Sequence, residues 1–348
     1  MTRVEIIPVG GVPEVRGGDD LASLLATALE PFGVRDGDVL CISTKVVSKA
    51  LGLVVAPDQR EAAITASTAR TVARRRHTRV VTSVVQIPSG PVMAAAGVDS
   101  SNAPEGPLLL PEDPDACAAE LHRELTAALG VRLGVVLTDT SSRVWRVGVG
   151  DIALGAAGVA SLEDLRGGTD RSGRPLTVTV RNLADELAAA ADLVKGKADG
   201  VPLALVRGVA GAVASGDESV PARELSRTGS DDWFRRPSLE SVWTALGLSA
   251  EQEPIARMSP EEDRVRIARA VEVALLPRPG GGSPRATAAV AGAHRIVVTP
   301  AGDSWQDGLE AGALAERLRT ALGAESIAAP LPAVQVQIQA PDQQEDRP

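Results

Sequence analysis

The chain has 348 residues and a formal net charge of −9, and its 44% hydrophobic and 23% charged residues are typical of a globular protein. This balance excludes collagen-like, coiled-coil and wholly disordered chains, and the length predicts two domains. The acidic charge, together with a 2% aromatic content that includes no tyrosine, argues against nucleic-acid binding, which needs clustered basic and often aromatic side chains.

Strand and helix patterns fill the first two thirds of the chain. Apolar runs predict strands at 4–7, 39–43, 80–87, 92–96, 132–137 and 201–206, and a further apolar stretch at 45–55 is interrupted by Gly52. Helices are predicted at 21–29, 61–79, 114–129 and 182–196, the second of them basic, with its charges on a solvated face. Asp19 and Asp20 are both candidates for the N-cap of the first helix, Asp113 is the expected cap of the third, the fourth is predicted to begin at Asn182, and Gly130 is placed to end a helix.

The composition changes near residue 236 and marks a second, smaller domain. Its predicted elements are helices at 238–247, 261–276 and 305–322 and a strand within 293–300. The polar segment 251–260 is typical of a linker, and PRPGGGSPR at 277–285 is typical of a flexible hinge. We therefore divide the chain into a large domain at 1–236, a small α/β module at 237–340 and a disordered tail at 341–348.

The basic side chains are unevenly divided between four lysines and 32 arginines. All four lysines fall in two short stretches, Lys45 with Lys49 and Lys195 with Lys197. A lysine ammonium binds phosphate as a compact point charge, so the grouping suggests phosphate chemistry, and chance clustering is the alternative.

Several familiar signatures are missing from the sequence. It has no Walker A loop and no dinucleotide-binding glycine motif, and its three histidines are too scattered to predict a metal site. Cys41 and Cys117 lie in apolar patterns that predict small core residues rather than a disulfide. No apolar run reaches the roughly 18 residues of a membrane span and no signal peptide is visible, so we expect a cytoplasmic protein that binds no membrane.

Oxygen-bearing side chains follow two of the predicted strands. Asp99 stands near Asn102, and Asp139 precedes Thr140 directly after the strand at 132–137. Carboxylate and hydroxyl oxygens are the ligands that Mg²⁺ and Mn²⁺ take when they bind together with nucleotide phosphates. The alternative is that these aspartates are turn or cap residues.

Five blocks in these regions resemble the coenzyme F420-0:L-glutamate ligase family, the GTP-dependent γ-glutamyl ligases of coenzyme F420. They span nearly all of 1–236 and read EIIPVGGVPEVRGGDDL (5–21), DGDVLCISTKVVSKALG (36–52), AGVDSSNAPEGPLLLPEDPDA (96–116), LTDTSSRVWRVGVGDIALG (137–155) and ADELAAAADLVKGKADGVPLALVRG (184–208). The resemblance implies an α+β fold with mixed sheets and flanking helices.

The resemblance also assigns roles to particular residues. The residues that it matches to GTP contacts are Val12, Pro13, Glu14, Val15, Thr44, Lys49 and Asn102. Those that it matches to divalent-metal ligands are Asp99, Asp139 and Thr140. Lys195 and Lys197 lie in the family's glycine–lysine stretch, where they are candidates for phosphate contacts, and a helix-capping role is the alternative. Lys49 and Asp139 are the catalytic candidates.

The reaction that the resemblance implies joins L-glutamate to F420-0, or to a related anionic acceptor, through an acyl phosphate made with GTP. Two Mg²⁺ or Mn²⁺ ions would neutralise phosphate oxygens, and K⁺ is a further candidate. A homodimer is expected, as in the family.

The chain departs from the family pattern at several positions. Ala95, Leu51 and Leu53 replace polar family residues, and 141–144 lack the usual glycine and proline of the loop after Asp139 and Thr140. These departures leave two alternatives open: a related ligase with another carboxylate acceptor, or a non-catalytic nucleotide-binding paralogue. The module at 237–340 is too short for the flavin domain of bifunctional members; 294–322 resembles a shrunken remnant of it, and FMN binding is not expected.

Overall fold

The computed structural model of the chain describes residues 3–77, 80–197, 199–214, 218–228, 232–234, 236–249, 252, 254, 261–278, 282–327 and 329–339. The chain forms two compact units, Met1–Ser226 and Arg227–Pro348, named here the N-terminal and C-terminal units. The predicted boundary at 236 coincides with the first residue of a helix in the C-terminal unit. The predicted tail, and most of the predicted linker at 251–260, lie outside the described residues.

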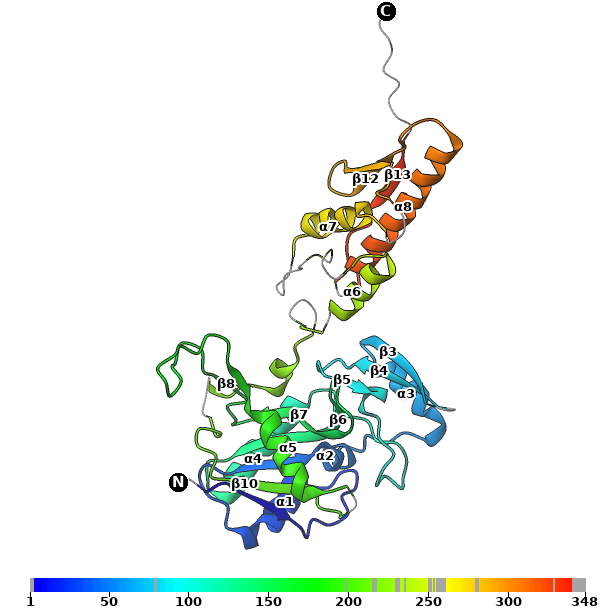
Figure 1. The fold of residues 1–348 in the computed structure, drawn as a ribbon. Coiled ribbons are helices and arrows are strands. Elements are labelled where there is room, and N and C mark those ends of the chain that lie inside the picture. Colours follow the sequence, from blue (N-terminus) through cyan, green and yellow to red (C-terminus); the bar gives the residue numbers. More distant parts are fainter. Residues whose placement is uncertain are drawn as a thin grey trace, which may run out of the picture. The chain divides into compact units, whose positions relative to one another are not determined.

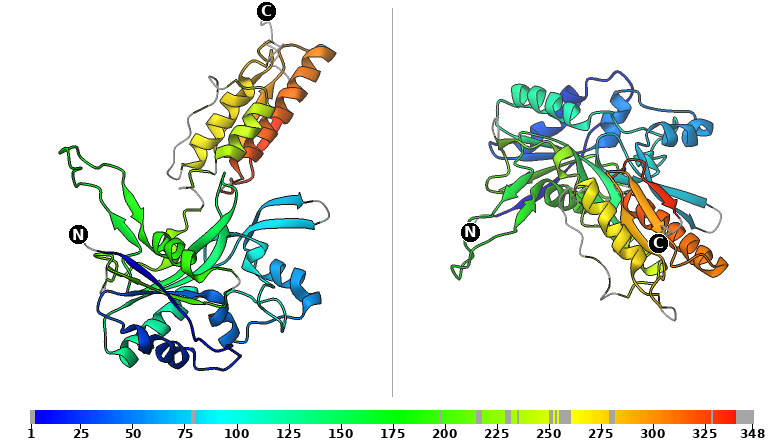
Figure 2. Two further views of the ribbon diagram at one scale, coloured as in Figure 1. Left: turned by 60° about the horizontal axis from the view of Figure 1, so that its bottom comes forward. Right: turned by 90° about the horizontal axis from the view of Figure 1, so that it is seen from above.

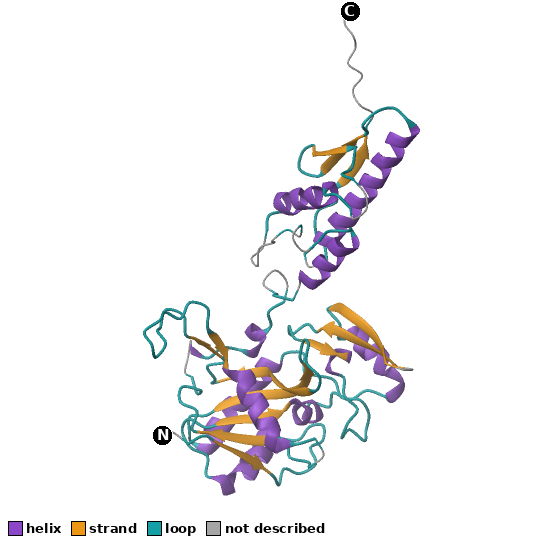
Figure 3. Cartoon of the chain, in the orientation of Figure 1, coloured by secondary structure: helices purple, strands orange, loops and turns teal. Residues whose placement is uncertain are grey.

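Helices and strands are interspersed in both units, which confirms the predicted α+β class (Figure 3). The described helices include none that combines the length and the apolar character needed to cross a lipid bilayer.

A mixed five-stranded sheet lies at the centre of the N-terminal unit (Figure 1). Its spatial order is β1-β10-β2-β6-β7, with β2 and β6 parallel and all other neighbours antiparallel. The strands are β1 (Glu5–Val9), β2 (Val39–Ser43), β6 (Gly134–Ser142), β7 (Val149–Ala157) and β10 (Leu203–Arg207). β1 continues through Pro8, where the sequence predicted its end, because an edge strand needs no N–H donor on its outer side.

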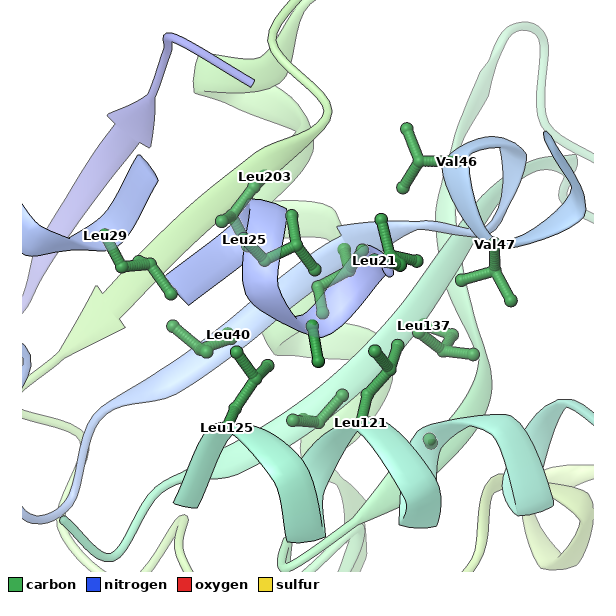
Figure 4. Packing of buried hydrophobic residues seen from close by; sticks show 14 of the residues in the cluster. Leu21, Leu25, Leu29, Leu40, Val46, Val47, Leu121, Leu125, Leu137 and Leu203 are labelled. Carbon is green, nitrogen blue, oxygen red and sulfur yellow. The ribbon is translucent and has the colours of Figure 1, made fainter. Parts of the chain in front are cut away.

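Two cores form on opposite faces of this sheet because side chains alternate along each strand. Leu40 and Ile42 of β2 share one core with helices α1 and α4, and Val39 and Cys41 share the other with α5. The three helices are α1 (Leu21–Leu29), α4 (Pro114–Leu129) and α5 (Leu183–Lys195). Figure 4 shows the first core, where Leu40 lies among leucines of α1 and α4.

The structure selects Asp20 over Asp19 as the cap of α1, confirms Asp113 as the cap of α4, and makes Asn182 the cap of α5 rather than its first residue. Asp20, Asp113 and Asn182 each accept the backbone N–H of the residue three positions further on, at 3.0 Å. Gly130 follows α4 with φ of 71°, a left-handed conformation that glycine adopts without a Cβ clash. Local capping therefore fixes the helix boundaries, as the sequence indicates.

The prediction of one basic helix over 61–79 is wrong beyond residue 66. Helix α3 ends at Ala66, and Arg70–His77 form strand β3, which pairs antiparallel with β4. Alanine and arginine favour helices, but pairing with a strand further along the chain satisfies the backbone hydrogen bonds and overrides that local preference. The elements of this region are α2 (Thr44–Ala50), α3 (Arg60–Ala66), β3 (Arg70–His77), β4 (Val80–Gln86) and β5 (Val92–Ala94). Figure 2 shows β3 and β4 as a hairpin beside the main sheet.

A two-stranded ribbon, β8 (Leu162–Asp164) and β9 (Val180–Asn182), completes the N-terminal unit. In the described part of the C-terminal unit, three helices pack with a three-stranded sheet of order β11-β12-β13 around a separate core. Its elements are α6 (Arg236–Ala245), α7 (Asp263–Leu275), β11 (Thr287–Val290), β12 (Arg295–Thr299), α8 (Trp305–Glu325) and β13 (Gln335–Ile338). The predicted helices and strand of this unit are thereby confirmed, apart from shifts of a few residues at their ends.

Cys41 should be inert toward alkylating reagents in the folded protein. Its side chain is fully buried, and burial raises the pKa of its thiol to about 12, so that almost no reactive thiolate forms at pH 8. Peptide mass spectrometry after iodoacetamide treatment should find Cys41 unmodified in the native protein and modified in urea. Cys117, which is only partly buried, serves as the internal comparison and should react first. Rapid native modification of Cys41 would contradict this packing.

Candidate active site

One cavity of about 280 Å³ lies beside the end of the parallel strand pair β2 and β6. It collects side chains from the loop after β1, from α2, from the β6–β7 pair and from the end of α5. The lining residues are Val12, Pro13, Glu14, Val15, Ser43, Lys45, Val46, Lys49, Asn102, Thr138, Asp139, Thr140, Asp151, Asp192, Lys195, Gly196, Lys197, Gly200, Val201 and Pro202. Ten of the twelve site residues assigned from the sequence are therefore neighbours here, and Thr44 and Asp99 are the two outside the lining.

All four lysines of the chain line this cavity, and no arginine does so among the described residues. Lys45 and Lys49 lie one helical turn apart on α2, which places them on one face. Lys195 is the last residue of α5, and Lys197 follows in the next loop. The clustering that the sequence suggested thus becomes a concentration of positive charge in a single hollow.

Asp151 of β7 binds two of these lysines. Its Oδ2 accepts hydrogen bonds from Lys195 Nζ at 2.6 Å and Thr138 Oγ1 at 2.9 Å. Its Oδ1 accepts from Thr140 Oγ1 at 2.9 Å and Lys197 Nζ at 3.3 Å. Burial by itself would raise the pKa of Asp151, but the two ammonium groups outweigh it and hold the pKa below its ordinary value. The residue therefore stays ionised.

Asp139 lies in a different environment on the neighbouring strand. Burial raises the pKa of its carboxyl to about 7, repulsion from Asp151 and Asp99 adds to the rise, and the backbone N–H of Thr140 opposes it. Among the described residues, no basic side chain forms an ion pair with this carboxylate. A poorly solvated carboxylate without a bound cation is the kind of group that a metal ion would stabilise. Strand β6 runs on to Ser142, so Asp139 and Thr140 lie within the strand rather than after it.

The loop that carries Asp99 and Asn102 closes one side of the cavity. Lys45 Nζ forms an ion pair with Asp99 Oδ2 at 2.7 Å and donates to Ser101 Oγ at 2.6 Å. Burial raises the pKa of Asp99, but hydrogen bonds from Lys45 and Ser101 outweigh burial and leave the pKa below its ordinary value. Asn102 Nδ2 donates to the backbone oxygen of Lys197 at 3.3 Å, which joins this loop to the loop after α5.

Lys49 and Thr44, both assigned to GTP binding, also have partners within the protein. Lys49 forms an ion pair with Glu14, so that the loop after β1 is tied to α2. Thr44 is fully buried, and its hydroxyl donates to the backbone oxygen of Thr138 at 3.1 Å. In this structure Thr44 thus joins α2 to β6 and does not reach the cavity through its side chain.

Sequence reasoning missed Asp151 as a site residue. Asp151 lies inside the block 137–155, where no local sequence pattern distinguishes it as a site residue. The one available signal is a lone carboxylate before an otherwise apolar, small-residue run, DIALGAAGVA at 151–160. Lys45 was noticed only as part of the lysine grouping, and its contact with Asp99 joins segments far apart in the chain.

The oxygen donors at the cavity suit a hard divalent cation, although they are few. The described residues contain no cluster of three or more histidine, cysteine or acidic side chains arranged to hold a metal. Asp139 and the hydroxyl of Thr140 are oxygen donors of the kind that Mg²⁺ and Mn²⁺ prefer. Asp99 becomes available as a third donor only if Lys45 moves away from it.

Comparison with known proteins shows which family the chain is similar to. The profile of the family described as F420-0:Gamma-glutamyl ligase matches residues 11–208, which lie inside the N-terminal unit. The coenzyme F420:L-glutamate ligase of Methanopyrus kandleri is 41% identical over 253 residues, covering 67% of this chain and 97% of the relative.

Two further relatives carry the same name. The protein of Archaeoglobus fulgidus is 38% identical over 250 residues, covering 67% of this chain and 97% of the relative. That of Haloarcula marismortui is 37% identical over 265 residues, covering 70% of this chain and 97% of the relative. Nearly the whole length of each relative is thus matched by about two thirds of this chain.

Proposed function

Because the chain belongs to the F420-0:gamma-glutamyl ligase family, we propose that it is a GTP- and divalent-metal-dependent ligase that adds L-glutamate to coenzyme F420-0. The observation that supports the nucleotide part of this proposal is the presence of all four lysines around one cavity. A nucleoside triphosphate and a carboxylate acceptor are both strongly anionic, and the chain as a whole carries a net charge of −9. Local positive charge is therefore needed to bind them.

In the proposed reaction the terminal carboxylate of F420-0 attacks the γ-phosphorus of GTP, and the bond from that phosphorus to the bridging oxygen breaks to release GDP. The amine nitrogen of L-glutamate then attacks the carbonyl carbon of the acyl phosphate. A C–N bond forms, the C–O bond to phosphate breaks, inorganic phosphate leaves, and the surplus proton of the amine passes to solvent.

The residues of this chain would contribute mostly position and charge, which are the main needs of phosphoryl transfer. Lys49, now paired with Glu14, would hold the transferring phosphate, and Lys197, which also lines the cavity, would hold the others. Asp139 and Thr140, joined by Asp99 once Lys45 leaves it, would hold the divalent cations. A bound cation there would neutralise phosphate oxygens and polarise the phosphorus.

The nature of the acceptor is the part of this proposal that the departures from the family pattern affect most. Leu51, 54% exposed, stands where the family has a polar side chain. Ala95 adopts a φ of 51°, a left-handed conformation that asparagine, the usual family residue, adopts more readily. These changes favour, as a second candidate, a related ligase with another carboxylate acceptor. The homodimer implied by the family also stays part of the proposal, and light scattering on the purified protein would test it.

The decisive experiment is mass spectrometry of a reaction with purified protein, F420-0, GTP, L-glutamate and Mn²⁺. We expect a product heavier by one or more glutamyl residues, with equal GDP and phosphate release, and none when GTP or metal is omitted. GTP binding by calorimetry without product would favour the other acceptor or a non-catalytic paralogue. Absence of both product and GTP binding would refute the site assignment.

A further inference from the structure

Asp151 is one of the residues that line the cavity, and it is enclosed by polar partners. Its side chain and that of Lys195 are 6% and 4% exposed. The antiparallel register of β6 and β7 places Thr140 directly opposite Asp151, and Thr138 lies two residues away on the same strand. One carboxylate therefore connects two strands with the end of helix α5.

Each carboxylate oxygen of Asp151 accepts hydrogen bonds from one threonine hydroxyl and one lysine ammonium, and the two oxygens have different partners. An ionised carboxylate offers about four lone-pair directions, so these four donors use its capacity. A carboxylate that binds metal or substrate must instead keep lone pairs free; Asp139 on the adjacent strand forms no ion pair within the described residues, whereas Asp151 forms two. The geometry is that of a group that orients other side chains.

The side chains that Asp151 orients are the ones that line the cavity. Lys195 and Lys197 are two of its four lysines, and Thr140 is the hydroxyl beside Asp139. Lys195 depends on this contact most, because a buried ammonium without a carboxylate is strongly destabilised. Lys197 has a second partner, Asp192, at 3.0 Å, so Asp151 and Asp192 together determine its direction.

We propose that Asp151 is a positioning residue that holds Lys195, Lys197 and the Thr140 hydroxyl toward the phosphates of the bound nucleotide, without touching the nucleotide itself. The proposal rests on the proposed function only in taking a nucleoside triphosphate as the ligand of the cavity. It makes no use of the identity of the acceptor. Removing the Asp151 carboxylate should therefore weaken nucleotide binding, whichever carboxylate acceptor is activated.

The test compares two buried aspartates that differ in what they bind. Asp115 is similarly buried, but its carboxylate accepts backbone N–H groups from Ala156, Ala222 and Arg223 at 2.7–3.1 Å, away from the cavity. GTP affinity in Mg²⁺ buffer is measured by calorimetry for the full chain, together with the unfolding temperature. Asp151→Asn should weaken GTP binding about ten- to hundredfold, whereas Asp115→Asn should lower the unfolding temperature and leave GTP affinity within about twofold.

A double variant separates positioning from general damage. If Asp151 acts through Lys195, Asp151→Asn should weaken GTP binding less in the Lys195→Met background than in the wild-type protein, because the lysine that it positions is already absent. Losses that multiply would overturn the proposal, and so would GTP affinity that is unchanged in Asp151→Asn. If Asp151→Asn does not fold, the double variant, which leaves no unpaired buried ammonium, gives the same comparison against Lys195→Met.

The same measurements distinguish this proposal from the proposed function. A wild-type protein that binds GTP but forms no glutamyl product would count against the ligase reaction and leave the Asp151 comparison fully readable. A wild-type protein that forms product, with an Asp151→Asn variant whose KM for GTP is unchanged, would count against the role of Asp151 alone.

Discussion

Replacing Asp139 with asparagine is expected to reduce metal-dependent turnover by about a thousandfold. The substitution keeps the shape of the side chain and removes the negative charge that would hold the cation at the phosphates. Asp139 is the carboxylate of this cavity that has no ion pair within the described residues, so its charge is available to a bound cation. The measurement is GDP release with saturating GTP, acceptor and Mn²⁺.

Protein stability distinguishes this result from a folding defect. Burial raises the pKa of Asp139 to about 7 in the folded, metal-free protein. At neutral and higher pH, ionised Asp139 therefore destabilises the folded state. Asp139→Asn should therefore leave the metal-free unfolding temperature unchanged or raise it. Asp164→Asn, on the exposed ribbon, is the control and should retain full turnover. Normal turnover in Asp139→Asn would mean that the aspartate is only a structural residue of β6.

Replacing Arg269 with methionine is expected to destabilise the C-terminal unit by about 3–5 kcal/mol. The Arg269 guanidinium binds Glu261 and Glu325 in two bidentate pairs with N–O distances of 2.7–2.9 Å. Burial disfavours the charged guanidinium, but the hydrogen bonds to Glu325 and Glu261 outweigh burial and raise its pKa. Removing the arginine leaves two buried carboxylates without a counter-charge.

Urea unfolding followed by tryptophan fluorescence would measure this effect. Trp243 is 1% exposed in the core of the C-terminal unit, whereas the other three tryptophans are exposed, so Trp243 dominates the signal change. Arg264→Met on the same helix is the matched control, because Arg264 is exposed and its effect should stay within about 0.5 kcal/mol. Adding Glu261→Gln and Glu325→Gln to Arg269→Met should restore most of the stability. A shift in Arg269→Met no larger than that of the control would show that the buried cluster contributes little.

The helices and their ends could be predicted from the sequence because their determinants are local. Asp20, Asp113 and Asn182 cap helices through bonds that span three residues, and the leucines of α4 recur with helical spacing. The same locality explains why the lysine grouping was visible: Lys45 with Lys49, and Lys195 with Lys197, are each separated by a few positions on one element. The resemblance then supplied most of the remaining cavity residues.

The parts that sequence reasoning missed depend on contacts between distant segments. Arg70–His77 became a strand because β4 lies beside it, and a local pattern cannot report a partner strand. Thr44 turned toward β6 instead of the cavity for the same reason.

By itself, then, the sequence determined the capped helices, the α+β class, the family and the grouping of the lysines. Only the tertiary structure decided which carboxylate binds which lysine. Asp151 and Lys195 are 44 positions apart, too far for a local sequence motif to pair them. Asp151 meets Thr140 through the register of β6 and β7, and meets Lys195 because α5 packs on that sheet. Burial raises the pKa of both neighbouring aspartates, but the ammonium groups beside Asp151 hold its pKa below the ordinary value, whereas the pKa of Asp139 stays raised.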